Sequence, residues 1–152
     1  MTERVVVVGA GTMGHGIAQV AAMANYDVML VDTNDSVLEA GRARIVANLD
    51  EGVRRGKVTA MQRDAALARL RTATSITDAA GNAVLAIEAV PERMDLKQAV
   101  FAELGRHMPG QAILATNTSS LSVTTLQRAT SNAARVIGMH FFNPVHINKL
   151  LE

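Results

Sequence analysis

The sequence contains no cysteine, no strong excess of either charge and no long uninterrupted apolar run. Because none of the 152 residues is cysteine, disulfide bonds, thiolate metal sites and a cysteine nucleophile are excluded. The net charge is only +1, and the one positive cluster, Arg54, Arg55 and Lys57, is typical of a solvated helical turn. Glycines break the N-terminal apolar run too early for a signal peptide or a membrane span. We therefore expect a cytoplasmic protein with no nucleic-acid or membrane partner.

Metal-ligand spacing is also missing, because His15, His107 and His146 do not fall into any pattern typical of a metal site. We predict no metal. Apolar residues, in contrast, make up 49% of the chain, which is enough for the core of one ordinary domain. No internal repeat, low-complexity tract or linker marks a boundary, so residues 1–152 are predicted to form a single domain.

Short apolar runs alternate along the chain with segments of helical periodicity. Continuous β-rich runs are typical of strands that are buried on both faces of a parallel sheet, and helices must then cover both faces. The predicted strands are Arg4–Val8, Asp27–Val31, Ala83–Val90, Ala112–Ala115 and Arg135–Met139.

Helical patterns fill the segments between these strands. Thr12–Ala24 and Asp95–His107 are the clearest predicted helices, and an asparagine follows the first of them where a C-terminal cap belongs. Ser36–Leu70 is too long for one crossover, and Gly52 and Gly56 divide it into two helical stretches. The sequence therefore predicts an α/β fold of the Rossmann type, a doubly wound and mostly parallel sheet with a helical hairpin inserted after the second strand.

The first chemical motif is VVVVGAGTMGHG, in which Gly9, Gly11 and Gly14 lie between a predicted strand and a predicted helix. This context is the one that a dinucleotide fingerprint requires. Gly9 permits the tight turn, Gly11 lets the backbone approach a pyrophosphate, and Gly14 lets helix and strand pack closely. Thr12 and Met13 begin the helix, whose free N–H groups favour phosphate binding.

Asp32 strengthens this interpretation, since it closes the second predicted strand eighteen residues after Gly14. A carboxylate at this place accepts hydrogen bonds from the adenosine ribose and repels the additional phosphate of NADP. The next residues, Thr33, Asn34 and Asp35, provide no arginine for that phosphate. NAD is therefore the predicted cofactor.

Polar residues also follow the other predicted strands. Pro91-Glu92, Thr116–Ser120 and His140 each come just after a strand, as Asp32 does. Ligands of an open parallel sheet bind beyond the carboxyl ends of its strands. Convergence of polar groups from four strands at this edge indicates an active site.

Four segments together resemble the NAD-binding domain of the L-3-hydroxyacyl-CoA dehydrogenases: GAGTMGHGIA, IEAVPERMDLKQAVFAEL, ATNTSSLSVT and GMHFFNPVHINKLLE. The resemblance extends from Arg4 to Glu152. It implies a Rossmann-type domain, followed in the full-length enzyme by a helical domain that is absent from this chain, forms a homo-oligomer and completes the acyl-CoA site. It also implies oxidation of the 3-hydroxyl group of a fatty acyl-CoA by NAD, or the reverse, as in β-oxidation.

Residue by residue, the resemblance places the family's catalytic histidine at His140 and its carboxylate partner at Glu152. Histidine suits this role because it titrates near the working pH, and a carboxylate on its other ring nitrogen fixes the tautomer. Ser119 and Asn143 match the positions that hydrogen-bond the oxygen of the substrate and support the histidine.

On the cofactor side, Glu92 and Lys97 match family positions that contact the nicotinamide ribose and the phosphates of the cofactor or of CoA. We assign Asn117 to the same site. A solvated helix face is the structural alternative for Lys97. For Ser119 and Ser120 the alternative is N-capping of a helix that begins near residue 122.

Substrate identity stays open. His146 and Asn148 replace the small residue and the methionine that are common in the family, and related enzymes act on carnitine or gulonate. An isolated NAD-binding module with little or no turnover is a second possible function. A hydroxyisobutyrate-type dehydrogenase is disfavoured, because such enzymes use a lysine from a later domain.

Overall fold

A computed structural model describes all residues from Met1 to Glu152, and it contains a single six-stranded sheet. Every pair of neighbouring strands is parallel. The order β3-β2-β1-β4-β5-β6 is that of a doubly wound dinucleotide-binding sheet. The strands are β1 (Arg4–Val8), β2 (Asp27–Val31), β3 (Leu70–Ala73), β4 (Ala83–Glu88), β5 (Ile113–Thr116) and β6 (Val136–Gly138).

Helices occupy the connections between the strands, and polar side chains cap several of them. Asn34 accepts hydrogen bonds from two backbone amides at the start of one helix, and Thr59 forms a capping box with Gln62 at the start of another. The helices are α1 (Thr12–Met23), α2 (Asp35–Arg54), α3 (Ala60–Arg69), α4 (Ile76–Ala80), α5 (Met94–His107) and α6 (Val123–Gln127), with a short 3-10 turn at Ala133–Arg135.

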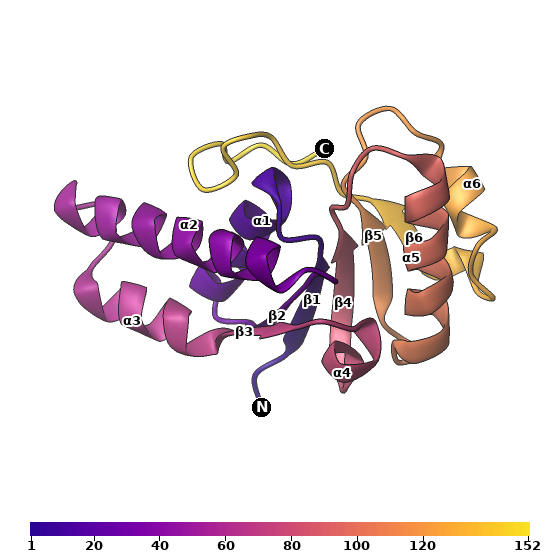
Figure 1. The fold of residues 1–152 in the computed structure, drawn as a ribbon, viewed down its shortest axis with the longest axis horizontal. Helices are drawn as coiled ribbons and strands as arrows, with labels where there is room; N and C mark the ends of the chain where they lie inside the picture. The colour runs from indigo at the N-terminus through magenta and orange to yellow at the C-terminus, as the bar shows by residue number, and fades with distance from the viewer.

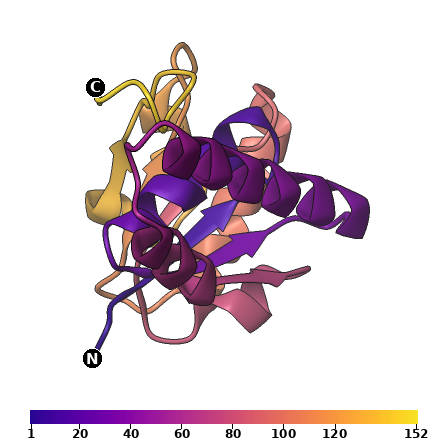
Figure 2. The same ribbon diagram turned by 90° about the vertical axis from the view of Figure 1, so that its left-hand side faces the viewer.

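The sheet separates two hydrophobic cores. A layer of helices covers each core on its side of the sheet (Figures 1 and 2). Alternate residues of a strand face opposite sides. Val5 and Val7 therefore pack with Ile17 in the core beneath α1 and α2, and Val6 and Val8 pack with Phe101 and others beneath α4, α5 and α6. This alternation explains why the strands are apolar without interruption.

Most of the predicted elements are present, with small shifts at their ends. β3 is a correction, because no strand was predicted between Val31 and Ala83. Its sequence, LRTA, has two exposed polar residues and lies at the edge of the sheet, so it lacks the apolar signal of a buried strand. Gly52 is a second correction, since it lies within α2, which continues to Arg54. Both α2 and α3 contact α1.

Residues 139–152 leave the sheet after β6 and fold back on themselves beside α1, at the top of Figure 1. Val145 is the anchor of this C-terminal segment. It is 6% exposed and belongs to the core beneath α1. A side chain at Gly16 would lie 3.0 Å from Val145 Cβ, so a glycine at this place makes room for the valine. None of the helices combines the length and the hydropathy that a membrane-spanning segment requires.

Candidate functional site

The glycine loop lies at the point where the strand order reverses, between β1 and β4. Gly9 has φ +102°, which favours glycine, and its N–H donates to the carbonyl of Val31 at 2.7 Å. A side chain at Gly9 would lie 2.6 Å from the carbonyl oxygen of Ala89, and one at Gly14 would lie 1.6 Å from that of Gly9. Gly9 and Gly14 therefore permit the contact of three backbone segments.

Gly11 differs from the other two glycines of the motif. A side chain built at Gly11 meets no atom within 4 Å, so the protein itself does not require glycine there. Gly11 is the N-cap of α1, and no side chain caps this helix. Its first N–H groups are therefore free to bind an anion. Open space beside a free helix N-terminus is what a bound pyrophosphate requires.

Asp32 links the glycine loop to the end of β2. Its carboxylate accepts hydrogen bonds from the backbone N–H groups of Ala10 at 3.1 Å and Asn34 at 3.2 Å. The carboxylate is thus held beside the loop while its residue is only half-buried.

A cleft of about 910 Å³ runs along the carboxyl edge of the sheet beside these groups. Three predicted strand ends contribute Asp32, Glu92 and Asn117 to its wall. Of the other predicted cofactor residues, Gly9, Gly11, Thr12, Met13 and Lys97 also line it, whereas Gly14 is packed beneath the loop. Sequence reasoning missed Thr74–Thr77 and several α5 residues in this wall, because no motif marks them.

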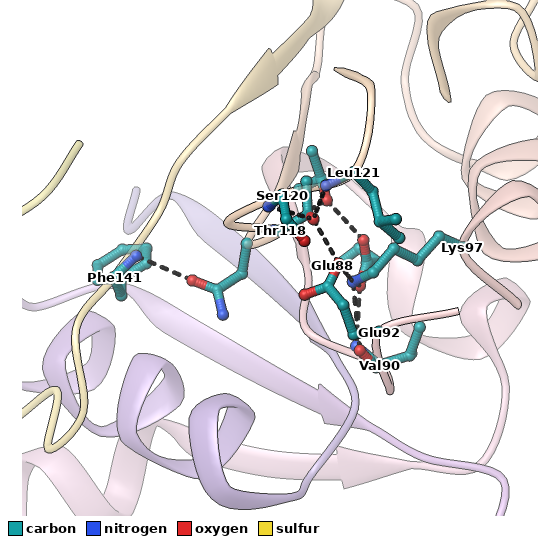
Figure 3. Close-up of polar contacts among 10 residues, drawn as sticks. Glu88, Val90, Glu92, Lys97, Thr118, Ser120, Leu121 and Phe141 are labelled. Atoms are coloured by element: carbon teal, nitrogen blue, oxygen red, sulfur yellow. Dashed lines mark hydrogen bonds and ion pairs between the residues drawn. The ribbon is translucent and has the colours of Figure 1, made fainter. Parts of the chain in front are cut away.

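Lys97 forms a buried ion pair in the cleft wall (Figure 3). Its Nζ lies 2.6 Å from Glu88 Oε2, and both side chains are at most 2% exposed. Glu88 also accepts hydrogen bonds from Thr116 Oγ1 at 2.7 Å and from the Val90 N–H at 2.9 Å. The solvated helix face considered for Lys97 is therefore wrong. Glu88 was missed because its place inside an apolar strand, IEAV, suggested packing alone.

The loop after β5 contains the predicted Ser119. Its side chain is exposed and forms no hydrogen bond within the chain, whereas the neighbouring Thr118 is buried. The capping alternative for Ser119 and Ser120 is wrong, because Ser122 is the N-cap of α6 and accepts from the Thr125 N–H at 3.2 Å.

His140 and Glu152 meet at the open end of the C-terminal segment. The distance from His140 Nδ1 to Glu152 Oε2 is 3.2 Å. Two backbone hydrogen bonds also join these residues, at 2.8 and 3.0 Å, so the main chain itself brings the carboxylate to the ring. The imidazole also lies 4.3 Å, centroid to centroid, from the ring of Phe142. His140 does not line the cleft.

Asn117 connects the cleft to this segment. Its side-chain oxygen accepts a hydrogen bond of 2.9 Å from the N–H of Phe141, the residue after His140. Asn143, the other predicted substrate residue, is exposed, and its side chain forms no hydrogen bond within the chain.

His146 lies near His15 of α1. Loss of solvent around the ring lowers the pKa of His146, and the positive charge of His15 lowers that pKa further. His15 Nδ1 is 2.7 Å from the carbonyl oxygen of Gly11. His15 therefore contacts the glycine loop, and its charge acts on His146 of the C-terminal segment. No group of three or more His, Asp or Glu side chains is arranged to hold a metal ion.

Comparison with known proteins identifies the family. Residues 4–152 match the model of the 3-hydroxyacyl-CoA dehydrogenase NAD-binding domain. The chain belongs to this family. The matched part of the family is the NAD-binding domain. The chain is 44% identical over 151 residues to the 3-hydroxybutyryl-CoA dehydrogenase of Mycobacterium tuberculosis. It is also 44% identical over 150 residues to the 3-hydroxyadipyl-CoA dehydrogenase of Escherichia coli. These alignments include 99% of this chain, but only 52% of the first relative and 31% of the second.

Solved structures agree with this assignment. The domain has a TM-score of 0.94 and 40% identity to (S)-3-hydroxybutyryl-CoA dehydrogenase from Ralstonia eutropha, covering 99% of this chain and 53% of that one. A diketoreductase that acts on dicarbonyl compounds has a TM-score of 0.91 and 30% identity, with the same coverage. The domain thus spans about half the length of most of these relatives.

Proposed function

We propose that this domain belongs to an enzyme that interconverts 3-hydroxyacyl-CoA and 3-ketoacyl-CoA with NAD. The pairing of His140 with Glu152 is the observation that supports this proposal most strongly. Relatives of about twice the length support a further proposal, that a helical domain outside this chain completes the acyl-CoA site and forms the contact between subunits.

The cleft residues fit NAD. Gly11 leaves open space beside the free N-terminus of α1, and Asp32 provides a carboxylate for the ribose hydroxyls. The three residues that follow Asp32, namely Thr33, Asn34 and Asp35, include no basic side chain for an additional phosphate. When bound, NAD supplies the acceptor for the hydride that leaves the alcohol carbon.

In the proposed reaction, His140 takes the proton of the 3-hydroxyl group. Its Nδ1–H donates to the Glu152 carboxylate, which leaves the lone pair of Nε2 free to act as the base. As the C–H bond gives its electron pair away as hydride, the O–H electron pair forms the carbonyl, and the proton remains on the imidazole. The carboxylate of Glu152 then stabilises the imidazolium ion.

We assign Ser119 and Asn143 to the substrate oxygen. Both side chains are exposed and have no partner within the chain, so their polar groups are available. Each could donate a hydrogen bond to the carbonyl oxygen, on which negative charge develops when the reaction runs toward the alcohol.

A pure NAD-binding module is the second candidate. It is favoured by one observation, that the cofactor residues gather around one cleft whereas His140 lies outside it. The two candidates differ in turnover. We therefore propose an assay of NADH oxidation with acetoacetyl-CoA, next to an NADH titration, with carnitine and gulonate tested as alcohol substrates in the presence of NAD. Binding without turnover of any of these would support the module.

A further inference from the structure

The Thr118 hydroxyl contacts both Glu92, a residue of the cofactor cleft, and the loop that contains Ser119. Thr118 is 7% exposed. On one side its Oγ1 donates a hydrogen bond to the Glu92 carboxylate, which lines the cleft. On the other side Oγ1 accepts from the backbone N–H groups of Ser120 at 3.3 Å and Leu121 at 2.9 Å (Figure 3). A single oxygen atom therefore holds a side chain of one wall and the backbone of the next loop.

The partners of the Thr118 hydroxyl allow only one direction for its hydrogen. A threonine hydroxyl has one hydrogen to donate and two lone pairs. Both lone pairs of Thr118 face N–H donors, so its hydrogen must point to Glu92. The hydroxyl is thus oriented by the loop, and it in turn orients the carboxylate.

A buried chain of polar contacts supports Thr118 from beneath. Its N–H donates to Thr116 Oγ1 at 3.2 Å, and Thr116 donates to Glu88, the partner of Lys97. Lys97 Nζ lies 3.9 Å from Glu92 Oε1, which closes a ring of five residues. Glu92 is the open member, with 46% of its side chain exposed, whereas Glu88 and Lys97 are at most 2% exposed.

We infer that Thr118 is a positioning residue that holds the Glu92 carboxylate toward the bound dinucleotide and, through the same oxygen, fixes the turn that presents Ser119. The part of this inference that concerns Ser119 rests on the proposed function. The part that concerns Glu92 requires only NADH binding by the domain.

The test is a thermodynamic cycle on NADH affinity. Thr118→Val removes the hydroxyl at nearly constant shape, and Thr118→Ser keeps it. Thr124 is exposed and its side chain forms no hydrogen bond within the chain, so Thr124→Val is the matched control. We expect Thr118→Val to weaken NADH binding about tenfold, and the serine and control variants to stay within about twofold of the wild type.

In a Glu92→Ala background, Thr118→Val should have almost no additional effect, because the group that it positions is gone. An equal loss with and without Glu92 would overturn the inference, and so would full affinity of the single Thr118→Val variant. Glu92→Ala alone gives a second readout that does not depend on the folding of Thr118→Val. It should speed hydrogen exchange of the Ser120 and Leu121 amides, and unchanged exchange would contradict the linkage.

Turnover of acetoacetyl-CoA in the enzyme that contains this domain tests the Ser119 side. Thr118→Val should lower kcat as well as NADH affinity, and it should lower kcat more than Glu92→Ala does, because it removes the acceptor of the Ser120 and Leu121 amides altogether. An unchanged kcat in Thr118→Val would overturn the link to Ser119. A wild-type protein with no turnover would instead refute the proposed function, and the NADH cycle would still decide the role of Thr118.

Discussion

The Asp32 carboxylate accepts a hydrogen bond of 3.1 Å from the backbone N–H of Ala10, which ties the end of β2 to the glycine loop. In the proposed function Asp32 therefore has two tasks, supporting the loop and accepting hydrogen bonds from the ribose. Asp32→Ala removes both, and we expect it to weaken NADH binding about tenfold or more and to narrow the preference over NADPH. Asp32→Asn keeps an acceptor for Ala10 without the charge, so its NADPH affinity should rise. Titration of both variants with both cofactors separates the tasks, and unchanged affinities would remove Asp32 from the cofactor site.

The glycine loop allows a paired test of packing and binding. A side chain at Gly11 meets no atom of the protein, whereas one at Gly14 would lie 1.6 Å from a backbone oxygen. Gly11→Val should therefore fold with a nearly unchanged melting temperature and lose most NADH binding. Gly14→Val should fail to fold or lose several degrees of melting temperature. Thermal unfolding with and without NADH measures both effects, and strong NADH binding by a folded Gly11→Val variant would contradict this account.

The buried pair of Glu88 and Lys97 predicts a large effect on stability. Lys97→Met leaves the Glu88 carboxylate without its cation in the interior, and we expect the free energy of unfolding to fall by about 3–5 kcal/mol. The double variant Glu88→Gln, Lys97→Met removes both charges and should recover much of this loss. Lys149→Met, at an exposed position, should change stability by less than about 0.5 kcal/mol. Urea unfolding measures the free energy of unfolding of all three variants. A small decrease in Lys97→Met alone would show that water reaches the Glu88 carboxylate.

The pair of His146 and His15 predicts a dependence of stability on pH. The pKa of His146 is lowered in the folded protein, so the unfolded chain binds more protons near and below pH 6.5. Its contribution to stability is therefore complete above that pH and is lost as the pH falls through the lowered folded pKa. His146→Gln should make stability less dependent on pH between about 6.5 and 5, and His15→Gln should have a smaller effect of the same sign. Urea unfolding at several pH values checks this, and identical slopes in wild type and His146→Gln would contradict it.

Much of the fold could be predicted from the sequence, because buried parallel strands and capped helices leave strong local signals. The GAGTMG loop, Asp32 and five of the six strands all follow from such signals. β3 could not be predicted in this way, since two of its four residues are polar and exposed and its pairing with β2 joins residues far apart in sequence.

In the candidate site, too, residues of local motifs could be predicted, whereas roles that depend on tertiary contacts could not. Motif residues such as Asp32 and Glu92 lie on the cleft as expected. The roles of Glu88 and Thr118 could not be predicted, because they depend on contacts between residues far apart in sequence, such as the bond between Thr116 and Glu88. The burial of Lys97 could not be predicted either, because a lysine on an amphipathic helix normally reaches solvent. Its ion pair with Glu88 explains why Lys97 is buried.

Catalysis by His140, oriented by Glu152, is the central claim, and a single comparison tests it most directly. In the complete enzyme, kcat for acetoacetyl-CoA reduction and the Kd for NADH would be measured for the wild type, His140→Ala and Glu152→Gln. We predict that His140→Ala lowers kcat by on the order of 100-fold or more while the Kd for NADH stays within about twofold, and that Glu152→Gln causes a smaller loss of kcat. A His140→Ala enzyme with the kcat of the wild type would contradict the account.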